Sequence, residues 1–211
     1  MTLAEDREDY VNDWLDLNRF EFDCDARMVW TDIETTGLDE NKNLMLEMAF
    51  VITDERGKVV DFFESLVIED KNYYAEYAEA NDTVKNMHKK SDLWLAAFDG
   101  PRMWSVEAGG EDLDDFLMSN LGGKDKYPLA GSSVHFDRKW LTKFYPKTMA
   151  RHFTHRNIDI SSIEEIVKLH RPELLEKMRG LDTRKYHRAL PDIVDTIKMY
   201  KFWLDNFLAV K

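Results

Sequence analysis

Two acidic residues two positions apart, Asp32 and Glu34, end an apolar segment that begins at Met28. If this segment is a β-strand, residues i and i+2 point to the same face, so the two carboxylates converge. Two such acids repel each other unless a cation lies between them, and their hard oxygen atoms suit Mg²⁺ or Mn²⁺. The pair therefore indicates a metal site, although acid pairs of this spacing are also common at the ends of surface strands.

A third acid, Asp137, falls within a segment that favours a helix from 134 to 144. Val134 lies three positions before it, so the carboxylate can share the apolar face that meets the sheet. Burying an acid is unfavourable unless the acid is paired or binds a metal, which makes Asp137 a candidate metal ligand. The alternative is an exposed aspartate in ionic contact with Arg138 or Lys139.

The segment His187-Arg-Ala-Leu-Pro-Asp192 supplies a histidine and a fourth acid. Asp192 falls in the first turn of a helix expected from 190 to 207, where the helix dipole favours a negative charge. His187 lies about one turn earlier, in the preceding loop, where it is in position to take a proton from an attacking water. The alternative is a loop histidine beside an aspartate that only caps the helix.

The elements that must position these residues follow from hydrophobic period and turn residues. A buried strand at 28–33 ends at Thr35-Thr-Gly37, and Asp54-Glu-Arg-Gly57 is a hairpin turn between two β-rich runs. The other expected strands are 48–53, 59–68, 128–131 and 158–160. Short helices are expected within 69–105, and further helices near 113–117, at 134–144 and from the capping residues Ser161 and Ser162 to Leu169. The last helix is expected at 190–207, with Pro191 in the first position. Together they predict an α/β domain, a mixed sheet covered by helices.

Length and composition predict one compact domain. The chain has 211 residues, of which 44% are hydrophobic and 12% aromatic, and this excludes intrinsic disorder. Residues 1–26 form an acidic N-terminal extension, in which Tyr10, Val11, Trp14 and Leu17 favour a short amphipathic helix. The candidate residues all lie in the remaining domain, 27–211.

The net charge of −12 argues against long duplexes as ligands, because their affinity depends on Lys and Arg contacts. Six Lys or Arg and no acid lie between 138 and 156, which suits a small phosphate-bearing ligand. The alternative is a solvated helix face followed by a loop. The chain has a single cysteine, Cys24, and its N-terminus lacks the pattern of a signal peptide. No apolar run approaches the ~20 residues that a membrane span needs. These features favour a soluble cytoplasmic protein without a membrane partner.

The five candidate residues, taken in order, resemble the signature of the DEDDh exonuclease superfamily, and the segments around them are similar to one branch of it, the oligoribonuclease family. The candidates are Asp32, Glu34, Asp137, His187 and Asp192. The segments are Met28-Val-Trp-Thr-Asp-Ile-Glu-Thr-Thr-Gly-Leu38, Leu46-Glu-Met-Ala-Phe-Val-Ile-Thr-Asp54, Gly131-Ser-Ser-Val-His-Phe-Asp-Arg-Lys-Trp-Leu141, Ile158-Asp-Ile-Ser-Ser162 and His187-Arg-Ala-Leu-Pro-Asp192. The resemblance covers about residues 28–208, nearly the whole chain after the acidic extension.

The resemblance implies an RNase H-like fold, with a mixed five-stranded sheet flanked by helices, and a homodimer. It also implies 3′→5′ hydrolysis of short single-stranded RNA, such as dinucleotides, to 5′-mononucleotides. Asp32, Glu34, Asp137 and Asp192 would hold two divalent metal ions, Mg²⁺ or Mn²⁺. Two such ions about 4 Å apart stabilise both the attacking and the leaving oxygen. His187 would activate the attacking water.

Substrate contacts follow from the same resemblance. Leu38 corresponds to a family residue that wedges against terminal bases. Arg156, next to His155, occupies the place of an arginine that helps to bind the 5′ phosphate of the substrate, with the dimer partner contributing. His88 and Ser91 match an H-x-x-S element near that site.

Three positions depart from the family pattern. Pro191 stands where the family usually has Asp, but the metal ligand is the next residue, Asp192. Thr83 stands where a family Trp stacks on a base, so that the stacking surface would be weaker or supplied by Trp94. His155 often corresponds to Tyr, which leaves the preference for short 5′-phosphorylated substrates less well defined.

Three other functions are compatible with parts of this pattern. A DEDDh exonuclease that acts on DNA or on longer RNA would use the same catalytic residues. A catalytically inactive nucleic-acid-binding or scaffold protein on the same fold would not need all five of those residues, and all five are present. A purely structural metal site would leave His187 without a role.

Overall fold

Five strands form one mixed sheet in the computed structural model, which describes residues 3–19, 26–67, 77, 79–99, 106–123 and 125–208. The strands are β1 (Met28–Thr35), β2 (Met45–Thr53), β3 (Val59–Leu66), β4 (Tyr127–Gly131) and β5 (Phe153–Asp159), in the order β3-β2-β1-β4-β5. β2 is antiparallel to β1 and β3, whereas β4 is parallel to β1 and β5. The expected mixed five-stranded sheet is therefore confirmed.

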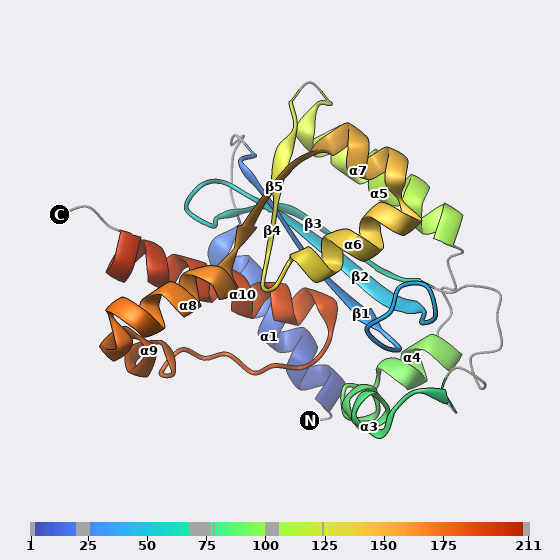
Figure 1. Cartoon of the computed structure of the whole chain (residues 1–211), viewed down its shortest axis with the longest axis horizontal. Coiled ribbons are helices and arrows are strands. Elements are labelled where there is room, and N and C mark those ends of the chain that lie inside the picture. Colours follow the sequence, from blue (N-terminus) through green and yellow to red (C-terminus); the bar gives the residue numbers. More distant parts are fainter. Residues whose placement is uncertain are drawn as a thin grey trace.

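Helices cover both faces of this sheet (Figure 1). On one face lie α5 (Val106–Leu121), α6 (His135–Phe144) and α7 (Pro146–His152), and on the other lie α1 (Leu3–Asn18), α8 (Ile160–His170), α9 (Pro172–Met178) and α10 (Ala189–Trp203). The two-residue period of β1 serves both layers, because Val29 and Ile33 pack with the first group and Trp30 with the second. Asp32 and Glu34 are in phase with Trp30 and so face the α10 side.

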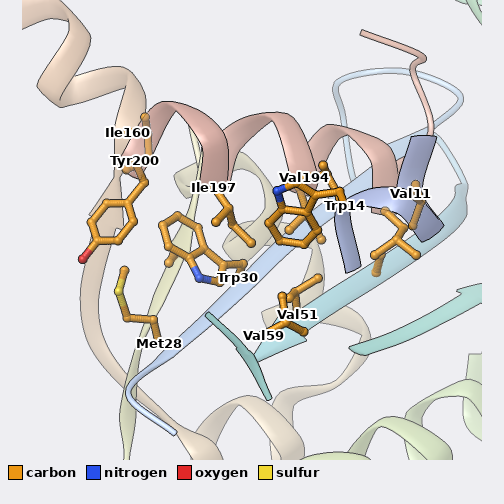
Figure 2. Packing of buried hydrophobic residues seen from close by; sticks show 14 of the residues in the cluster. Val11, Trp14, Met28, Trp30, Val51, Val59, Ile160, Val194, Ile197 and Tyr200 are labelled. Carbon is orange, nitrogen blue, oxygen red and sulfur yellow. The ribbon is translucent and has the colours of Figure 1, made fainter. Parts of the chain in front are cut away.

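The acidic N-terminal segment contributes the helix α1 to this second face. The buried residues of α1 are Tyr10, Val11, Trp14 and Leu15. Figure 2 shows Val11 and Trp14 in one hydrophobic cluster with Trp30 of β1 and Val194 of α10. The amphipathic helix is thus present, but the expectation for Leu17 is wrong. That side chain is 82% exposed, because the helix turns about 100° per residue and carries position 17 off the buried stripe.

The segment after α6 differs from the expected loop and three-residue strand. Pro146 begins α7, and β5 then runs for seven residues. β4 supplies the parallel edge on which β5 forms, with Gly131 opposite Asp159. Asp159, and neither of the expected serines, caps α8, because its side chain accepts a hydrogen bond from the backbone N–H of Ser161 at 3.0 Å. Neither α7 nor α9 is predicted from the sequence.

The C-terminal helix begins one residue earlier than expected, at Ala189, so Pro191 is its third residue and not its first. The missing N–H of Pro191 still leaves no bond broken, since the first N–H groups of a helix have no partner within it. α10 ends at Trp203 and continues as a π-helical turn, Leu204–Leu208.

Two short helices, α3 (Asp82–Lys90) and α4 (Leu93–Asp99), form a smaller unit around Leu46 of β2. They agree with the short helices expected within 69–105. Parts of that range, 69–76, 78 and 100–105, and the expected strand end at Ile68 lie outside the described residues. In the part of the chain that the structure describes, no helix has the length and apolar character needed to cross a bilayer.

Candidate active site

Three of the candidate acids meet at the carboxyl end of β1. Asp32 and Glu34 lie on β1, and Asp192 lies in the first turn of α10, which packs on the same face of the sheet. One carboxylate oxygen from each residue lies within 4.8 Å of an oxygen from each of the others. The pairing of β1 with β2 shifts register directly after Glu34, and irregular pairing beside active sites redirects side chains. We call Asp32, Glu34 and Asp192 the acid cluster.

The acid cluster is poorly solvated and repulsive. Burial raises the pKa of Asp32 well above its ordinary value, and the charges of Asp137 and Glu34 raise it further. Burial, followed by the charge of Asp192, also raises the pKa of Glu34. Burial raises the pKa of Asp192 to about 7, and its buried Oδ1 has no hydrogen-bond partner among the described residues. Hard oxygens that repel one another and include an unpartnered atom fit a divalent cation.

Asp137 reaches the same end of β1 from α6, on the other face of the sheet. Its side chain is 4% exposed, and its Oδ1 accepts a hydrogen bond from the backbone N–H of Ile33 at 3.0 Å. Burial raises the pKa of Asp137 to about 7, although two backbone N–H groups oppose the rise. It lies outside the group of three oxygens, yet its charge acts on Asp32. The exposed alternative is wrong, because Arg138 and Lys139 bind other partners.

His187 lies exposed in the loop between α9 and α10. Its backbone N–H lowers the pKa of Asp192 by hydrogen bonding, which partly opposes the effect of burial and brings the histidine backbone to the edge of the acid cluster. Partial burial lowers the pKa of the His187 imidazole, and the positive charges of Lys185 and Lys90 lower it further. The ring is therefore neutral at pH 7 and able to accept a proton.

An ion pair between Glu47 and Arg188 lies beside the acid cluster, and neither residue is among the candidates predicted from the sequence. Glu47 of β2 lies opposite Glu34 of β1. Arg188 donates through Nε to both Glu47 oxygens, at 2.9 and 3.0 Å, and the backbone N–H of Ala189 donates to Glu47 Oε2 at 2.9 Å. The pair joins β2 to the residue that follows His187 and fixes the start of α10. Its signal in the sequence is a single acid within the otherwise apolar segment 45–52.

Leu38 protrudes from the loop between β1 and β2, with 80% of its side chain exposed. The loop is braced from within, because Thr36 Oγ1 accepts a hydrogen bond from the backbone N–H of Leu44 at 2.9 Å. At position 37 an added Cβ would lie 2.5 Å from Asn43 Oδ1, so a side chain there would displace the Asn43 amide that accepts a hydrogen bond from the backbone N–H of Asp39. A large apolar side chain is thus held in solvent just beyond the carboxyl end of β1.

His88 and Ser91 lie behind the acid cluster. His88 Nε2 donates to the carbonyl oxygen of Thr35 at 2.9 Å, and its Nδ1 lies 3.8 Å from Glu34 Oε2. The Ser91 carbonyl accepts a hydrogen bond from Arg7 Nη1 of α1 at 3.0 Å. Both side chains are buried. His88 braces β1 and Glu34, and the Ser91 hydroxyl donates to the His88 carbonyl oxygen at 3.4 Å, so direct contact with a substrate would require both side chains to be uncovered.

His155 and Arg156 are exposed on β5, the edge strand of the sheet. β4 separates β5 from β1, and the parallel register sets Arg156 level with the start of β1, whereas Asp32 and Glu34 lie toward its end. Within one chain the structure therefore does not bring Arg156 to the acid cluster.

Comparison with known proteins identifies the family. A model of the exonuclease family (RNase_T) matches residues 29–200. An oligoribonuclease of Chromobacterium violaceum is 30% identical over 183 residues, which cover 87% of this chain and 96% of the relative. The mitochondrial oligoribonuclease of Bos taurus is 35% identical over 185 residues, 88% of this chain and 75% of the relative. The chain belongs to the oligoribonuclease family. The resemblance of its motifs to this family is confirmed.

Solved structures of exonuclease I share the oligoribonuclease-like fold of this chain. A complex of the Escherichia coli enzyme with single-stranded DNA superposes with a TM-score of 0.66 at 15% identity, covering 88% of this chain and 42% of that chain. A second structure of exonuclease I gives a TM-score of 0.62 at 16% identity. This chain spans about two fifths of the length of those chains, and at such identities the likeness concerns the fold alone. The RNase H-like fold is thereby confirmed.

Two further features concern the helix α1 and the tryptophan expected to stack on a base. The helix α1 lies before the matched range 29–200. Thr83, in the place of the family Trp, lies in α3, and Trp94 does not replace it as a stacking surface. The Trp94 side chain is buried, with its ring edge-on to His88 at 5.6 Å between centroids, so the expectation for Trp94 is wrong.

Proposed function

We propose that this protein is a 3′→5′ exoribonuclease that hydrolyses short RNA oligonucleotides, dinucleotides included, to 5′-mononucleotides. The observation that carries the proposal is the convergence of Asp32, Glu34 and Asp192 at one point, with His187 on the adjoining loop, in a member of the oligoribonuclease family. The relatives that cover most of the chain are named oligoribonucleases. Exonucleases that act on DNA or on longer RNA are the second candidate, but their structural likeness extends only to the fold.

Asp32, Glu34, Asp137 and Asp192 would hold two divalent ions, Mg²⁺ or Mn²⁺. The acid cluster supplies closely spaced oxygens, and the unpartnered Asp192 Oδ1 supplies a free ligand atom. When bound, such ions supply positive charge that offsets the charge developing on the phosphate and on the leaving oxygen. The raised pKa values of these carboxyls mean that protons compete with metal at neutral pH.

His187 would act as general base. Its neutral imidazole takes a proton from the attacking water, whose oxygen forms a bond to phosphorus. The bond from phosphorus to the 3′ oxygen breaks, and that oxygen leaves with the shortened chain and takes up a proton. The released product is a 5′-mononucleotide.

Leu38 and Arg156 would contact the two ends of a short substrate. Leu38 offers an exposed apolar surface to a terminal base, and Arg156 offers an exposed guanidinium to a 5′ phosphate, with His155 beside it. Because Arg156 lies away from the acid cluster of its own chain, we propose a homodimer in which Arg156 of one protomer serves the acid cluster of its partner. His88 and Ser91 would support the site through Glu34 and β1.

A time course with a 5′-labelled dinucleotide and a 5′-labelled seven-residue RNA, in Mn²⁺ and in EDTA, tests the activity. Rapid, metal-dependent loss of the dinucleotide with slower trimming of the longer RNA is expected. Rapid trimming that stalls at the dinucleotide would transfer the function to the second candidate. No cleavage of either substrate in Mn²⁺ or Mg²⁺ would contradict the proposal.

Mixing two impaired variants, one that lacks turnover and one that binds substrate weakly, tests the shared site with a 5′-phosphorylated dinucleotide well below its KM. Asp32→Asn and Arg156→Ala, denatured and refolded together, form mixed dimers in which one site has both an intact acid cluster and an intact arginine. Activity well above that of either variant alone is expected. Light scattering that finds only monomers, or a mixture no more active than its components, would contradict the homodimer proposal.

We also propose the cytoplasmic location that is expected from the sequence. The bacterial relatives carry no organelle in their names, whereas the bovine and human relatives are named mitochondrial. Fractionation of the source cells with an antibody against this chain separates the two compartments.

A further inference from the structure

The loop that carries His187 is held in an unusual backbone conformation. We define the His187 loop as residues 182–187, between α9 and α10. Lys185 and His187 have φ angles of 48° and 54°, in the left-handed region that residues other than glycine seldom adopt. Such conformations persist only where the surroundings impose them. The contacts that hold this loop therefore bear on the position of His187.

One set of contacts passes through Asp195 of α10. Its Oδ2 accepts hydrogen bonds from the backbone N–H groups of Arg184 and Lys185, each at 3.0 Å. Its Oδ1 accepts a hydrogen bond from the hydroxyl of Tyr10 on α1. Lys198 Nζ donates to that hydroxyl at 2.7 Å and to the carbonyl oxygen of Asp182 at 2.9 Å. α1 is thus joined to the loop backbone through the Asp195 carboxylate and also directly, because the Tyr10 hydroxyl lies 2.9 Å from the Asp182 carbonyl oxygen.

A second set of contacts acts on the loop side chains. Asp6 of α1 accepts hydrogen bonds from the Tyr186 hydroxyl at 2.6 Å and from Arg184 Nη1 at 3.0 Å. The Tyr10 ring packs against the Tyr186 ring with 5.5 Å between centroids, and the Arg184 guanidinium lies over the Tyr10 ring at 4.9 Å. Tyr186 is buried and directly precedes His187. The loop is therefore tied to α1 on both sides of Lys185.

Two groups of residues on α1 make different contacts, one with the hydrophobic core and the other with the His187 loop. Val11, Trp14 and Leu15 fill the hydrophobic cluster under α10, which accounts for the attachment of the helix to the domain. Asp6 and Tyr10 add polar contacts that reach only the His187 loop and α10. Packing alone requires no hydroxyl at position 10 and no carboxylate at position 6.

We propose that α1 is a positioning element for His187, acting through Tyr10 and Asp6 on the residues that precede the histidine. The role rests on the proposed function, in which His187 is the base, and α1 lies before the range 29–200 that the family model matches. The polar contacts of Tyr10 and Asp6 then help to position the catalytic histidine, and their loss would release the loop while the packing of Val11, Trp14 and Leu15 keeps α10 and the acid cluster in place.

The test uses Tyr10→Phe, which removes only the hydroxyl. The control is Tyr200→Phe, which removes another hydroxyl from the same core cluster, one that donates to the Glu55 carbonyl at 2.7 Å, away from the loop. Assays use the full chain, saturating Mn²⁺ and a labelled dinucleotide, well below the melting temperature of each variant. For Tyr10→Phe we expect kcat to fall about tenfold with KM within about twofold, because a displaced base lowers the rate without weakening binding. Tyr200→Phe retains the wild-type kcat.

A double-mutant cycle separates positioning from general loosening. In a His187→Ala background, Tyr10→Phe causes no further loss of kcat, since the group that it positions is gone. A second tenfold loss in that background would overturn the role, and so would an unchanged kcat for Tyr10→Phe. Hydrogen–deuterium exchange gives a readout that does not depend on turnover. Exchange in segment 182–187 should be about tenfold faster in Tyr10→Phe and unchanged in Tyr200→Phe, and equal exchange in the wild type and Tyr10→Phe would overturn the tie itself.

Failure of the proposed function is recognised separately. A wild-type chain that cleaves no RNA in Mn²⁺ overturns both the activity and this role. A wild-type chain that cleaves RNA, together with a His187→Ala variant that does not, leaves the activity in place, and the Tyr10→Phe result then decides the role of α1 alone.

Discussion

The acid cluster and the edge strand β5 carry opposite charges, and the fold buries the first and exposes the second. Around Asp32, Glu34 and Asp192 the fold gathers like charges and removes them from water, so their pKa values rise. On β5 it leaves Arg156 exposed, at a distance from the acids of the same chain. Buried repulsion is costly unless a cation relieves it, whereas an exposed guanidinium costs almost nothing until an anion arrives. The first region is thus suited to a bound cation, and the second to an incoming anion.

Neutralising one member of the acid cluster should give the largest effect. Asp192→Asn keeps the size of the side chain and removes a proposed metal ligand, so we expect turnover to fall at least about 10³-fold. The melting temperature of the metal-free protein should rise by roughly 2–4 °C, because repulsion within the cluster is relieved. Calorimetry in EDTA and the dinucleotide assay measure the two effects. Asp205→Asn, an exposed change just beyond the same helix, is the control, and a lower melting temperature for Asp192→Asn would refute the description of the cluster as repulsive.

Removing the base should slow the reaction without touching the metal site. For His187→Ala we expect kcat to fall about 10²–10⁴-fold, with the rise in melting temperature on adding Mn²⁺ unchanged. His170→Ala, an exposed histidine on α8, should behave as the wild type. Loss of the Mn²⁺-induced stabilisation in His187→Ala would assign the histidine to metal binding.

The edge strand should act on binding and not on chemistry. For Arg156→Ala we expect KM for a 5′-phosphorylated dinucleotide to rise about tenfold with little change in kcat, since a hydrogen bond to a charged group is lost. The difference from the wild type should disappear when the dinucleotide carries no 5′ phosphate. Arg179→Ala, which removes an exposed arginine paired with Glu176 on α9, controls for net charge. An equal loss on both substrates would exclude contact with that phosphate.

A change of pH should give the smallest effect, on stability alone. Asp137 and Asp192 have pKa values of about 7 in the folded, metal-free protein, above their ordinary value of 3.8. The folded state therefore binds more protons than the unfolded state between about pH 4 and pH 7, and its stability falls as the pH rises through that window. We expect the melting temperature in EDTA to decline from pH 5 to pH 7 and the gain on adding Mn²⁺ to grow over the same range. A metal-free melting temperature that rises with pH would contradict the assignment.

The strand β1 and the helix α10 can be predicted from the sequence because their hydrophobic residues recur with the period of a strand and of a helix. The strand that carries Asp32 alternates between two cores, and the stripe of α10 fixes the side on which Asp192 appears. β5 is different, since its central residues, Thr154 to Asn157, are polar and largely exposed. It becomes a strand because β4 offers an open parallel edge, and pairing of that kind leaves no hydrophobic alternation to read.

Long-range polar contacts are the other part that the sequence conceals. A lone glutamate in an apolar strand marks Glu47 as unusual, but nothing near it in the chain names Arg188 as its partner. The same holds for Tyr10, whose position in a helical stripe predicts burial and not a hydrogen bond to Asp195. The period of the hydrophobic residues predicts which side chains are buried. The partner of a buried polar group depends instead on how the helices pack.

The link between Tyr10 and Asp195 also bears on when the site is assembled during translation. The two residues are 185 positions apart, and Asp192 is made just before Asp195. Contacts of such separation form only after the intervening chain has been synthesised and the loop between them has closed. A nascent chain that ends before the His187 loop has Asp32, Glu34 and Asp137 but neither Asp192 nor His187. An RNA-degrading centre is therefore absent while most of the chain is still being made on its own messenger RNA, and it is completed only when α10 has left the ribosome.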